Sequence, residues 1–313
     1  GGIGHRIVHG GESYGTSVRV TDEVEAKIET LGALAPLHNP VHLEGIRAAR
    51  EWFPDVPQVT VFDTAFHQTL PEYAYRYALP FQLYERHGIR RYGFHGTSHR
   101  YVSERAARLL GKNAFTGVTC HLGNGSSLAA IREGRSIDTT MGLSPLGGIP
   151  MGTRSGDLDP AIVLHLQNRL NYRPEEVDEL LNRKSGLLGM SGISNDLREV
   201  EAAASEGNPR AQLAIEVMAY QIAKSIGSYL ATLDDADGIV FTGGIGENAA
   251  GMRQRIIGRL PGLAVALDEE SNRQADRREA IISSENSHLT VLVIPTREDW
   301  IIARDTYDLI QEA

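Results

Sequence analysis

The stretch His121-Leu-Gly-Asn-Gly-Ser-Ser-Leu128 lies between two runs whose β-branched and apolar composition predicts strands, residues 117–122 and 128–131. Two glycines flank its asparagine, and two hydroxyl side chains follow. Glycines let backbone N–H groups approach an anionic oxygen closely, and short hydroxyl side chains add hydrogen bonds. The stretch therefore predicts a phosphate-binding turn, with an ordinary glycine-rich hairpin as the alternative.

A second glycine-rich stretch, Phe241-Thr-Gly-Gly-Ile-Gly-Glu-Asn248, follows a strand-like run at 237–240 and precedes a predicted helix at 249–257. A strand, a glycine turn and a helix N-terminus favour nucleotide binding, because unpaired N–H groups face the ligand. The sequence contains no G-x-x-x-x-G-K-[ST] motif, and the first stretch lacks the third glycine of G-x-G-x-x-G. A P-loop fold and a dinucleotide-binding fold are therefore disfavoured.

The composition is typical of a soluble globular protein with one large domain or two: the 313 residues are 41% hydrophobic and 23% charged. The net charge of −9 and the scattered basic residues disfavour a nucleic-acid partner. No apolar run approaches the length of a membrane span, so no membrane partner is expected. The single cysteine, Cys120, lies in a predicted strand and fits a reducing compartment, which makes the cytoplasm the expected location.

Strand and helix patterns alternate along the chain and predict an α/β fold. Strands are predicted at residues 1–9, 58–62 and 289–295, and helices at 20–35, 41–52, 97–110, 212–233 and 298–312. Pro36 and Pro40 prevent the first helix from continuing. Asp63 directly follows the strand at 58–62, and open α/β sheets bind their ligands at such strand ends. Asp63 is therefore a candidate site residue.

A long irregular segment, residues 138–160, is rich in glycine and proline. Loops of this length inside a compact chain are more often functional than idle. Arg154 is the only cation in the segment, and Gly152 and Gly156 flank it. This pattern favours a guanidinium presented to a phosphoryl group or a carboxylate. The alternative is an ion pair with Asp157 or Asp159.

Three pairs of histidines are spaced four residues apart, as metal ligands on a helix would be: His5 with His9, His38 with His42, and His95 with His99. The first pair lies in a predicted strand, the second brackets a proline, and no pair carries the glutamate of H-E-x-x-H. A zinc hydrolase is therefore disfavoured, and single histidines that donate hydrogen bonds to phosphate groups are the favoured interpretation.

The chain resembles the acetate and butyrate kinase family, within the superfamily of acetate and sugar kinases, Hsc70 and actin. Eight motifs carry the resemblance, in family order along essentially the whole chain. They are Gly4-His-Arg-Ile-Val-His-Gly-Gly-Glu12, Ala35-Pro-Leu-His-Asn-Pro40, Phe62-Asp-Thr-Ala-Phe-His-Gln-Thr69, Arg91-Tyr-Gly-Phe-His-Gly-Thr-Ser-His99, and residues 121–127, 151–160, 241–248 and 303–306. The resemblance implies an actin-like, ribonuclease H-like kinase fold of two domains. It also implies Mg²⁺-dependent, reversible, in-line transfer of the ATP γ-phosphoryl group to acetate, giving acetyl phosphate and ADP.

The resemblance also implies roles for individual residues. The implied catalytic residues are Arg6, Asp63, His95 and Arg154, and the implied acyl-binding residues are Arg6, Val8, Leu37, Phe94 and Pro145. The implied ATP-binding residues are His121, Gly123, Asn124, Gly125, Asp196, Leu197, Arg198, Gly243, Gly244, Ile245, Gly246 and Asn248. Glu298 matches a carboxylate that holds Mg²⁺ or Mn²⁺, usually through water.

The implied domains are a remainder of domain I at residues 1–65, with the helix at 298–313 packed on it, and a nucleotide-binding and dimerisation domain II at 66–297. A homodimer is expected. Family members open with a strand and an Asn-x-Gly-Ser-Ser-Ser-x-Lys phosphate loop, and this sequence begins after that element, so domain I is expected to be truncated. Two alternatives follow: a propionate or butyrate kinase, since one methylene changes discrimination by only about 1–3 kcal/mol, and an inactive nucleotide-binding fragment.

Overall fold

The computed structural model describes residues 1–35, 38–275 and 278–311 and is an α/β structure, as predicted. Its contacts divide the chain into two compact units. Unit 1 comprises Gly1–Phe115, Ile131–Ser144 and Thr296–Ala313, and unit 2 comprises Thr116–Ala130 and Pro145–Pro295. Contacts thus group residues 66–115 with the N-terminal segment, whereas the sequence prediction assigns them to domain II. The boundary at residue 65 stays a prediction about functional domains.

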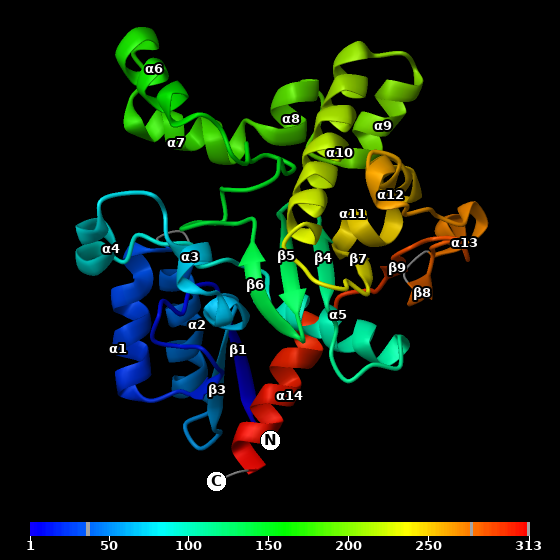
Figure 1. The fold of residues 1–313 in the computed structure, drawn as a ribbon. Coiled ribbons are helices and arrows are strands. Elements are labelled where there is room, and N and C mark those ends of the chain that lie inside the picture. Colours follow the sequence, from blue (N-terminus) through cyan, green and yellow to red (C-terminus); the bar gives the residue numbers. More distant parts are fainter. Residues whose placement is uncertain (36–37, 276–277, 312–313) are drawn as a thin grey trace. The chain divides into compact units, whose positions relative to one another are not determined.

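Unit 1 is built on a three-stranded sheet with β3 at its centre (Figure 1). β1 (Ile3–Ile7) pairs with β3 (Gln58–Phe62) in parallel, and β2 (Val18–Arg19) pairs with β3 in antiparallel orientation. The register places Arg6 beside Val61. The carboxyl ends of β1 and β3 therefore adjoin, which brings together the residues at and just beyond those ends.

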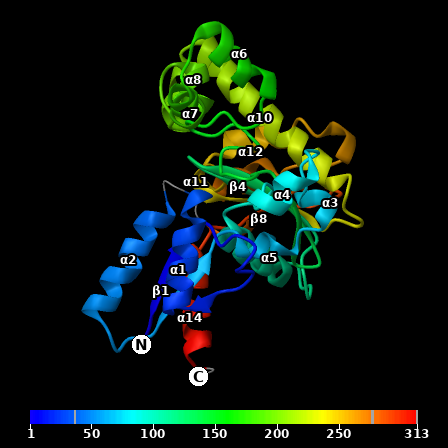
Figure 2. The ribbon, with the colours of Figure 1, turned by 90° about the vertical axis from the view of Figure 1, so that its left-hand side faces the viewer.

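Helices cover both faces of this sheet. α1 (Asp22–Thr30) and α2 (Asn39–Trp52) lie side by side over one face (Figures 1 and 2), and α14 (Glu298–Gln311) contacts β1 and β3 on the other. Apolar side chains fill both interfaces: Ile7, Val24, Ile28, Leu43, Ile46 and Phe62 on the first face, and Val59, Val61 and Ile301 on the second. Successive residues of a strand point to opposite faces, so one short strand contributes to two apolar layers.

The two N-terminal helices differ from their predicted bounds. The predicted helix at 20–35 is α1 followed by a 3-10 turn, Leu31–Ala33, and the Thr21 hydroxyl caps α1 by accepting a hydrogen bond from the Val24 N–H. The predicted helix at 41–52 begins earlier, at Asn39. Pro40 lies in its first turn, where the missing N–H of proline leaves no hydrogen bond unmade.

The remaining elements of unit 1 follow β3 in the chain. They are η2 (Ala65–Thr69), α3 (Glu72–Tyr75), α4 (Phe81–His87), α5 (Gly96–Leu109) and β6 (Arg135–Thr139). α5 packs against both η2 and α14, and β6 packs against η2.

Unit 2 contains a second sheet, in which β4 (Gly117–Leu122), β7 (Gly238–Thr242) and β9 (Thr290–Val293) are parallel. β5 (Ser126–Arg132) lies beside β4, and β8 (Ala280–Ile281) pairs with β9 in antiparallel orientation. β7 is buried throughout, as a central parallel strand is expected to be. The parallel register again aligns the carboxyl ends of neighbouring strands.

The long helix α10 (Pro209–Leu230) packs against β4 and is in turn covered by α8 (Gly186–Ser191), α9 (Leu197–Ser205) and α12 (Ala250–Ile257). The other helices of unit 2 are α6 (Pro160–Leu170), α7 (Pro174–Arg183), α11 (Gly243–Asn248), η3 (Pro261–Leu263) and α13 (Glu269–Gln274). Within the described ranges, no helix is both long and apolar enough to cross a membrane.

Candidate active site

Two charged side chains meet at the carboxyl ends of β1 and β3. Arg6 donates from Nε to Asp63 Oδ1 at 2.9 Å and from Nη2 to Oδ2 at 2.7 Å, which is a bidentate pair. Asp63 lies one residue beyond β3, as predicted, and its N–H donates to the Ile7 carbonyl at 2.9 Å. The backbone around the carboxylate is therefore fixed by the sheet, and the parallel register explains why Arg6 reaches it.

Burial sets the electrostatics of this pair. The Asp63 side chain is 3% exposed, whereas the Arg6 side chain is 43% exposed. Loss of hydration raises the pKa of Asp63 above its ordinary value, and the hydrogen bonds from Arg6 oppose that effect. The same bonds raise the pKa of Arg6, so its guanidinium stays charged. A fixed and partly accessible guanidinium is suited to bind a carboxylate or a phosphoryl group.

Two further residues of unit 1 complete the cluster. Glu298, the first residue of α14, places Oε2 at 3.5 Å from Arg6 Nη2. Thr97, in the first turn of α5, donates from Oγ1 to the same Glu298 oxygen at 3.1 Å. Thr97 was not predicted as a site residue, although it lies inside the predicted motif at 91–99. The only signal for it in the sequence was that position, because a threonine near a helix start usually has a capping role.

The donor set of this cluster fits Mg²⁺. Asp63 and Glu298 supply carboxylate oxygens, and Thr97 supplies a hydroxyl oxygen. Within the part of the chain that the structure describes, no group of three or more His, Cys, Asp or Glu side chains could hold a metal ion. Mg²⁺ does not need such a cage, because it keeps several waters and takes one or two protein carboxylates together with substrate phosphates.

Phe94 and His95 precede α5 and lie in the same unit as the cluster. Phe94 is buried, and its ring makes an edge contact with the His9 ring at 5.6 Å between centroids. His95 adopts a left-handed backbone conformation, with φ of 56°. Val8 is half-buried just after β1. Leu37, the other implied acyl-binding residue of this region, lies outside the described residues.

In unit 2 a cavity of about 540 Å³ gathers three segments far apart in the sequence. It is lined by Gly123, Asn124, Asn195, Asp196, Leu197, Arg198, Glu201, Gly244, Ile245, Asn248 and Ala249. Most of the implied ATP-binding residues are thus brought together, whereas His121, Gly125, Gly243 and Gly246 do not line this cavity. Glu201 and Ala249 line it without having been predicted as binding residues.

The predicted phosphate turn is held in one shape by its own side chains. Ser126 Oγ lies 3.1 Å from the Gly123 N–H and 3.0 Å from the Gly123 carbonyl, so it accepts from one and donates to the other. The Asn124 amide oxygen accepts a hydrogen bond from Asn195 at 2.9 Å, and the Asn124 carbonyl accepts one from the Gly152 N–H at 3.1 Å. These contacts fix the turn in the lining of the cavity.

The second glycine-rich stretch was predicted to be a turn, but it is helical in the structure. Residues Gly243–Asn248 form the short helix α11, and α12 follows at Ala250, close to the predicted start of a helix at 249. Gly243 makes the sharp entry possible: its φ is +76°, and an added Cβ would lie 2.7 Å from the Leu122 carbonyl oxygen. Its N–H donates to Glu247 Oε1 at 2.9 Å. A glycine at this position therefore lets the chain leave β7 close to the end of β4 without a clash.

Comparison with known proteins identifies the family. A profile described as Acetokinase family matches residues 1–304. The chain belongs to this family. Acetate kinases from Clostridium botulinum (strain Hall / ATCC 3502 / NCTC 13319 / Type A) and Clostridium novyi (strain NT) are each 53% identical to it. The match to the first covers 98% of this chain and 78% of the relative, and that to the second 99% and 78%.

Solved structures of acetokinases agree with this assignment. A propionate kinase from Francisella tularensis subsp. tularensis SCHU S4 superposes with a TM-score of 0.95 at 48% identity, covering 98% of this chain and 79% of that one. Porphyromonas gingivalis acetate kinase gives 0.95 at 46% identity, covering 99% and 78%. These likenesses confirm the predicted kinase fold. The chain is a phosphotransferase whose acceptor is a carboxyl group, and ATP or ADP is its nucleotide substrate.

Three implied acetokinase residues of unit 2 have distinct environments. Arg154 is half-buried, which lowers its pKa, and its Nη1 donates to the Pro145 carbonyl at 3.2 Å. The structure gives Arg154 no ion pair with Asp157 or Asp159 in the described ranges, and Asp157 instead accepts from the Gly148 N–H. In the adenosine segment, Arg198 pairs with Asp196 and lowers the pKa of that carboxylate to about 2.

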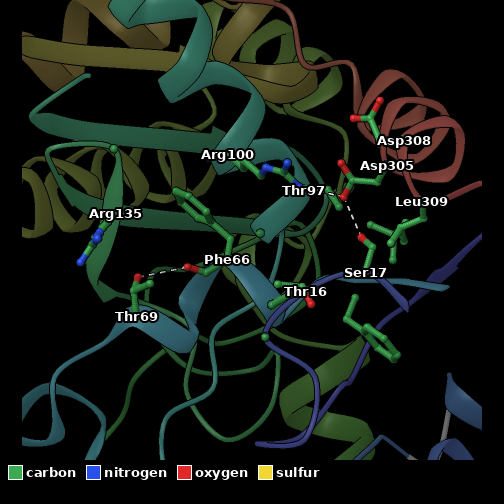
Figure 3. A pocket seen from close by; sticks show the side chains of 16 residues that line it. Thr16, Ser17, Phe66, Thr69, Thr97, Arg100, Arg135, Asp305, Asp308 and Leu309 are labelled. Carbon is green, nitrogen blue, oxygen red and sulfur yellow. Dashed lines mark hydrogen bonds and ion pairs between the residues drawn. The ribbon is translucent and has the colours of Figure 1, made fainter. Parts of the chain in front are cut away.

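Unit 1 contains a further cavity, of about 420 Å³, that the sequence did not predict (Figure 3). Hydroxyl and charged side chains from five segments face it, with Phe66 on one side. Asp305 Oδ2 accepts hydrogen bonds from Ser17 at 2.6 Å and from Arg100 at 2.8 Å. Thr97 lines this cavity and also donates a hydrogen bond to Glu298. One lining residue of the cavity therefore also supports the charged cluster of Arg6, Asp63 and Glu298.

Proposed function

We propose that this acetokinase catalyses the reversible transfer of the ATP γ-phosphoryl group to acetate, giving acetyl phosphate and ADP. The observation that carries the proposal is the cluster of Arg6, Asp63 and Glu298 at adjoining strand ends. It combines a fixed cation for an acid substrate with carboxylates for a divalent metal ion. In the transfer, an acetate oxygen attacks the γ-phosphorus in line, and the bond from that phosphorus to the bridging oxygen of ADP breaks.

Arg6 is proposed to bind the acetate carboxylate and the transferring group. Asp63 accepts two hydrogen bonds from Arg6, so the guanidinium is already oriented before substrate binds. The Arg6 side chain therefore loses little conformational entropy on binding. His95 and Arg154 are proposed to donate to the equatorial oxygens of the phosphoryl group as charge shifts onto them. The half-buried position of Arg154, without a paired carboxylate among the described contacts, supports this use.

The cavity in unit 2 is proposed to hold the nucleotide. Its volume of about 540 Å³ falls in the range of small-molecule sites, and peptide groups of two glycine-containing segments border it. Asp196, Leu197 and Arg198 would contact the adenosine, and Asn124 the γ-phosphate. The proposal for Asn124 is supported by the clasp that holds its turn rigid.

Glu298 and Asp63 are proposed to hold Mg²⁺, or Mn²⁺ in its place. A bound divalent ion would neutralise phosphate charge and orient the β- and γ-phosphates. Thr97 keeps the Glu298 carboxylate in place by donating to Oε2. The residues of the chain therefore orient the carboxylates before the ion arrives.

Propionate is the competing acceptor, because a propionate kinase is 48% identical to this chain. The buried Phe94 and the half-buried Val8 are proposed to bound the space for the methyl group of acetate. An extra methylene would have to displace such side chains, and this supports acetate as the better substrate.

The deciding experiment measures acyl phosphate as hydroxamate with ATP, Mg²⁺ and acetate, propionate or butyrate in turn. We expect the highest kcat/KM with acetate and a loss of at least about a hundredfold in Arg6→Ala. Arg86→Ala, which changes an exposed arginine of α4, is the matched control and should behave as wild type. A higher kcat/KM with propionate would reassign the substrate. No hydroxamate with any of the three acids would refute the proposed function.

We also propose a cytoplasmic homodimer. The single buried cysteine fits a reducing compartment, and α10 exposes Leu213 and Tyr220 on its outer side. Light scattering of the purified chain should give twice the mass of 34.2 kDa. A monomer at assay concentration would contradict the dimer without affecting the proposed reaction.

A further inference from the structure

A buried histidine that the sequence analysis left without a role joins three segments of unit 1. His67 lies in η2 and is fully buried. Its Nε2 is 3.0 Å from the Phe94 carbonyl oxygen, and its Nδ1 is 2.8 Å from Ser136 Oγ on β6. A carbonyl can only accept, so Nε2 carries the proton and Nδ1 accepts from the serine hydroxyl. Burial lowers the pKa of His67 to about 4, which keeps the ring neutral at pH 7.

The neighbouring backbone is tightly constrained. Gly93 has φ of +77°, and an added Cβ there would lie 2.7 Å from His67 Cδ2, so the ring packs directly on this glycine. The Ser136 carbonyl accepts a hydrogen bond from Thr69 Oγ1 at 2.7 Å, which ties β6 to η2 a second time. The imidazole ring of His67 is therefore fixed in one position, and its hydrogen bond fixes the position of the Phe94 carbonyl.

The residue after Phe94 has an unusual conformation. His95 has φ of 56°, in the left-handed region that a side chain with a Cβ seldom occupies. The peptide before it is held through Phe94 by His67, and the peptide after it is held by a 2.9 Å hydrogen bond from the Gly96 N–H to the Asp63 carbonyl. Strained residues persist only where the surroundings fix both flanking peptides, and they concentrate at functional sites.

We propose that His67 is a positioning residue that holds His95 in its left-handed conformation, so that the His95 imidazole is presented to the phosphoryl group. The inference rests on the proposed function only for the role of His95 in transfer. The structural role is independent of the reaction. In it, His67 and Ser136 form a clamp that holds the peptide between residues 94 and 95. Breaking the clamp lets that peptide rotate and removes His95 from the reactive position.

Two isosteric variants test the clamp through activity. The amide nitrogen of glutamine is as many bonds from Cβ as Nε2 of histidine, whereas that of asparagine matches Nδ1. His67→Gln thus keeps a donor for the Phe94 carbonyl, and His67→Asn loses it. We expect kcat within threefold of wild type for His67→Gln and at least tenfold lower for His67→Asn, with KM for ATP unchanged in both. The exposed pair His87→Gln and His87→Asn is the matched control. Equal kcat for the two His67 variants would overturn the proposal.

An unfolding experiment tests the clamp without any activity. His95→Gly relieves the strain, because glycine adopts positive φ without penalty. We expect His95→Gly to raise the urea midpoint of the wild-type chain and to leave that of His67→Asn unchanged, since the strain is already released there. An equal rise in both backgrounds would overturn the clamp. If His67→Asn does not fold, Ser136→Ala replaces it, and a rise as large as in wild type would then overturn the proposal. Failure of acetyl phosphate formation by the wild-type chain would refute the proposed function and leave this result standing.

Discussion

Asp63→Asn should lower the activity of this acetokinase strongly while changing its stability little. The substitution keeps the shape of the side chain but removes the charge that orients Arg6 through bonds of 2.9 and 2.7 Å. An asparagine oxygen can still accept one of these bonds, whereas its NH₂ group faces a donor and cannot accept the other. The guanidinium is therefore no longer held in a single orientation when substrate arrives.

Two terms oppose each other in the stability change. A hydrogen bond to a charged group contributes about 1.5–3 kcal/mol, but the exposed fraction of Arg6, 43%, lets water replace part of that loss. Asparagine also removes the desolvation cost of a buried carboxylate, which amounts to several kcal/mol. We expect the free energy of unfolding to change by no more than about 1 kcal/mol, while kcat falls by about 10²–10³, the usual cost of removing one oriented group.

The pH dependence of stability gives a second measurement with a definite sign. Burial raises the pKa of Asp63 in the folded chain, so the ionised carboxylate is disfavoured by folding. The wild-type chain therefore loses stability, relative to Asp63→Asn, as the pH rises from the ordinary aspartate pKa of about 3.9 through the folded-state value. Urea unfolding of both proteins across this range measures the difference. Asp308→Asn, at an exposed site on α14, is the control for activity and should leave kcat close to that of wild type. A loss above about 3 kcal/mol, or a kcat within tenfold of wild type, would refute the reasoning.

Two further substitutions test the other parts of the site. Gly243→Ala places a Cβ 2.7 Å from the Leu122 carbonyl oxygen at φ of +76°. It should lower the free energy of unfolding by about 1–3 kcal/mol and weaken ADP binding measured by calorimetry. Gly244→Ala, whose added Cβ would have nothing within 4 Å, should leave the stability nearly unchanged. Equal melting temperatures for the two variants would contradict the role of Gly243. Thr97→Val removes the donor to Glu298 and should raise the Mg²⁺ concentration for half-maximal rate several-fold, with kcat lowered about tenfold. Thr30→Val on the exposed side of α1 is its control, and an unchanged Mg²⁺ titration would exclude Thr97 from the metal site.

The sequence predicted those features that a local pattern determines. The strand at 58–62 and the position of Asp63 after it follow from β-branched composition over consecutive residues, and β3 has these bounds. The start of α2 at Asn39 was missed because a proline can end one helix or occupy the first turn of the next, and only the fold selects between them. Likewise, a run of glycines reads as a turn, yet the close approach to Leu122 shows that Gly243 opens a helix.

The features that the sequence could not predict are pairs of residues far apart in the chain. Thr97 became a candidate only when α5 and α14 brought it within 3.1 Å of Glu298, 201 residues away. The role of His67 depends on Ser136 and Phe94, which approach it through the packing of β6 on η2 and through the tight passage at Gly93. No local periodicity encodes such contacts, since each depends on how separate elements pack.

Asp63 shows why a catalytic substitution in this fold can leave the scaffold intact. Its N–H bonds to the Ile7 carbonyl and its carbonyl accepts from the Gly96 N–H, both at 2.9 Å, so β1, β3 and the start of α5 are joined through its backbone alone. The side chain, by contrast, bonds to Arg6 and is proposed to hold Mg²⁺. Because backbone and side chain serve different partners, a change of side chain alters the site and spares the junction. The left-handed His95 depends on the same backbone junction, and its conformation should therefore survive Asp63→Asn while being lost in His67→Asn.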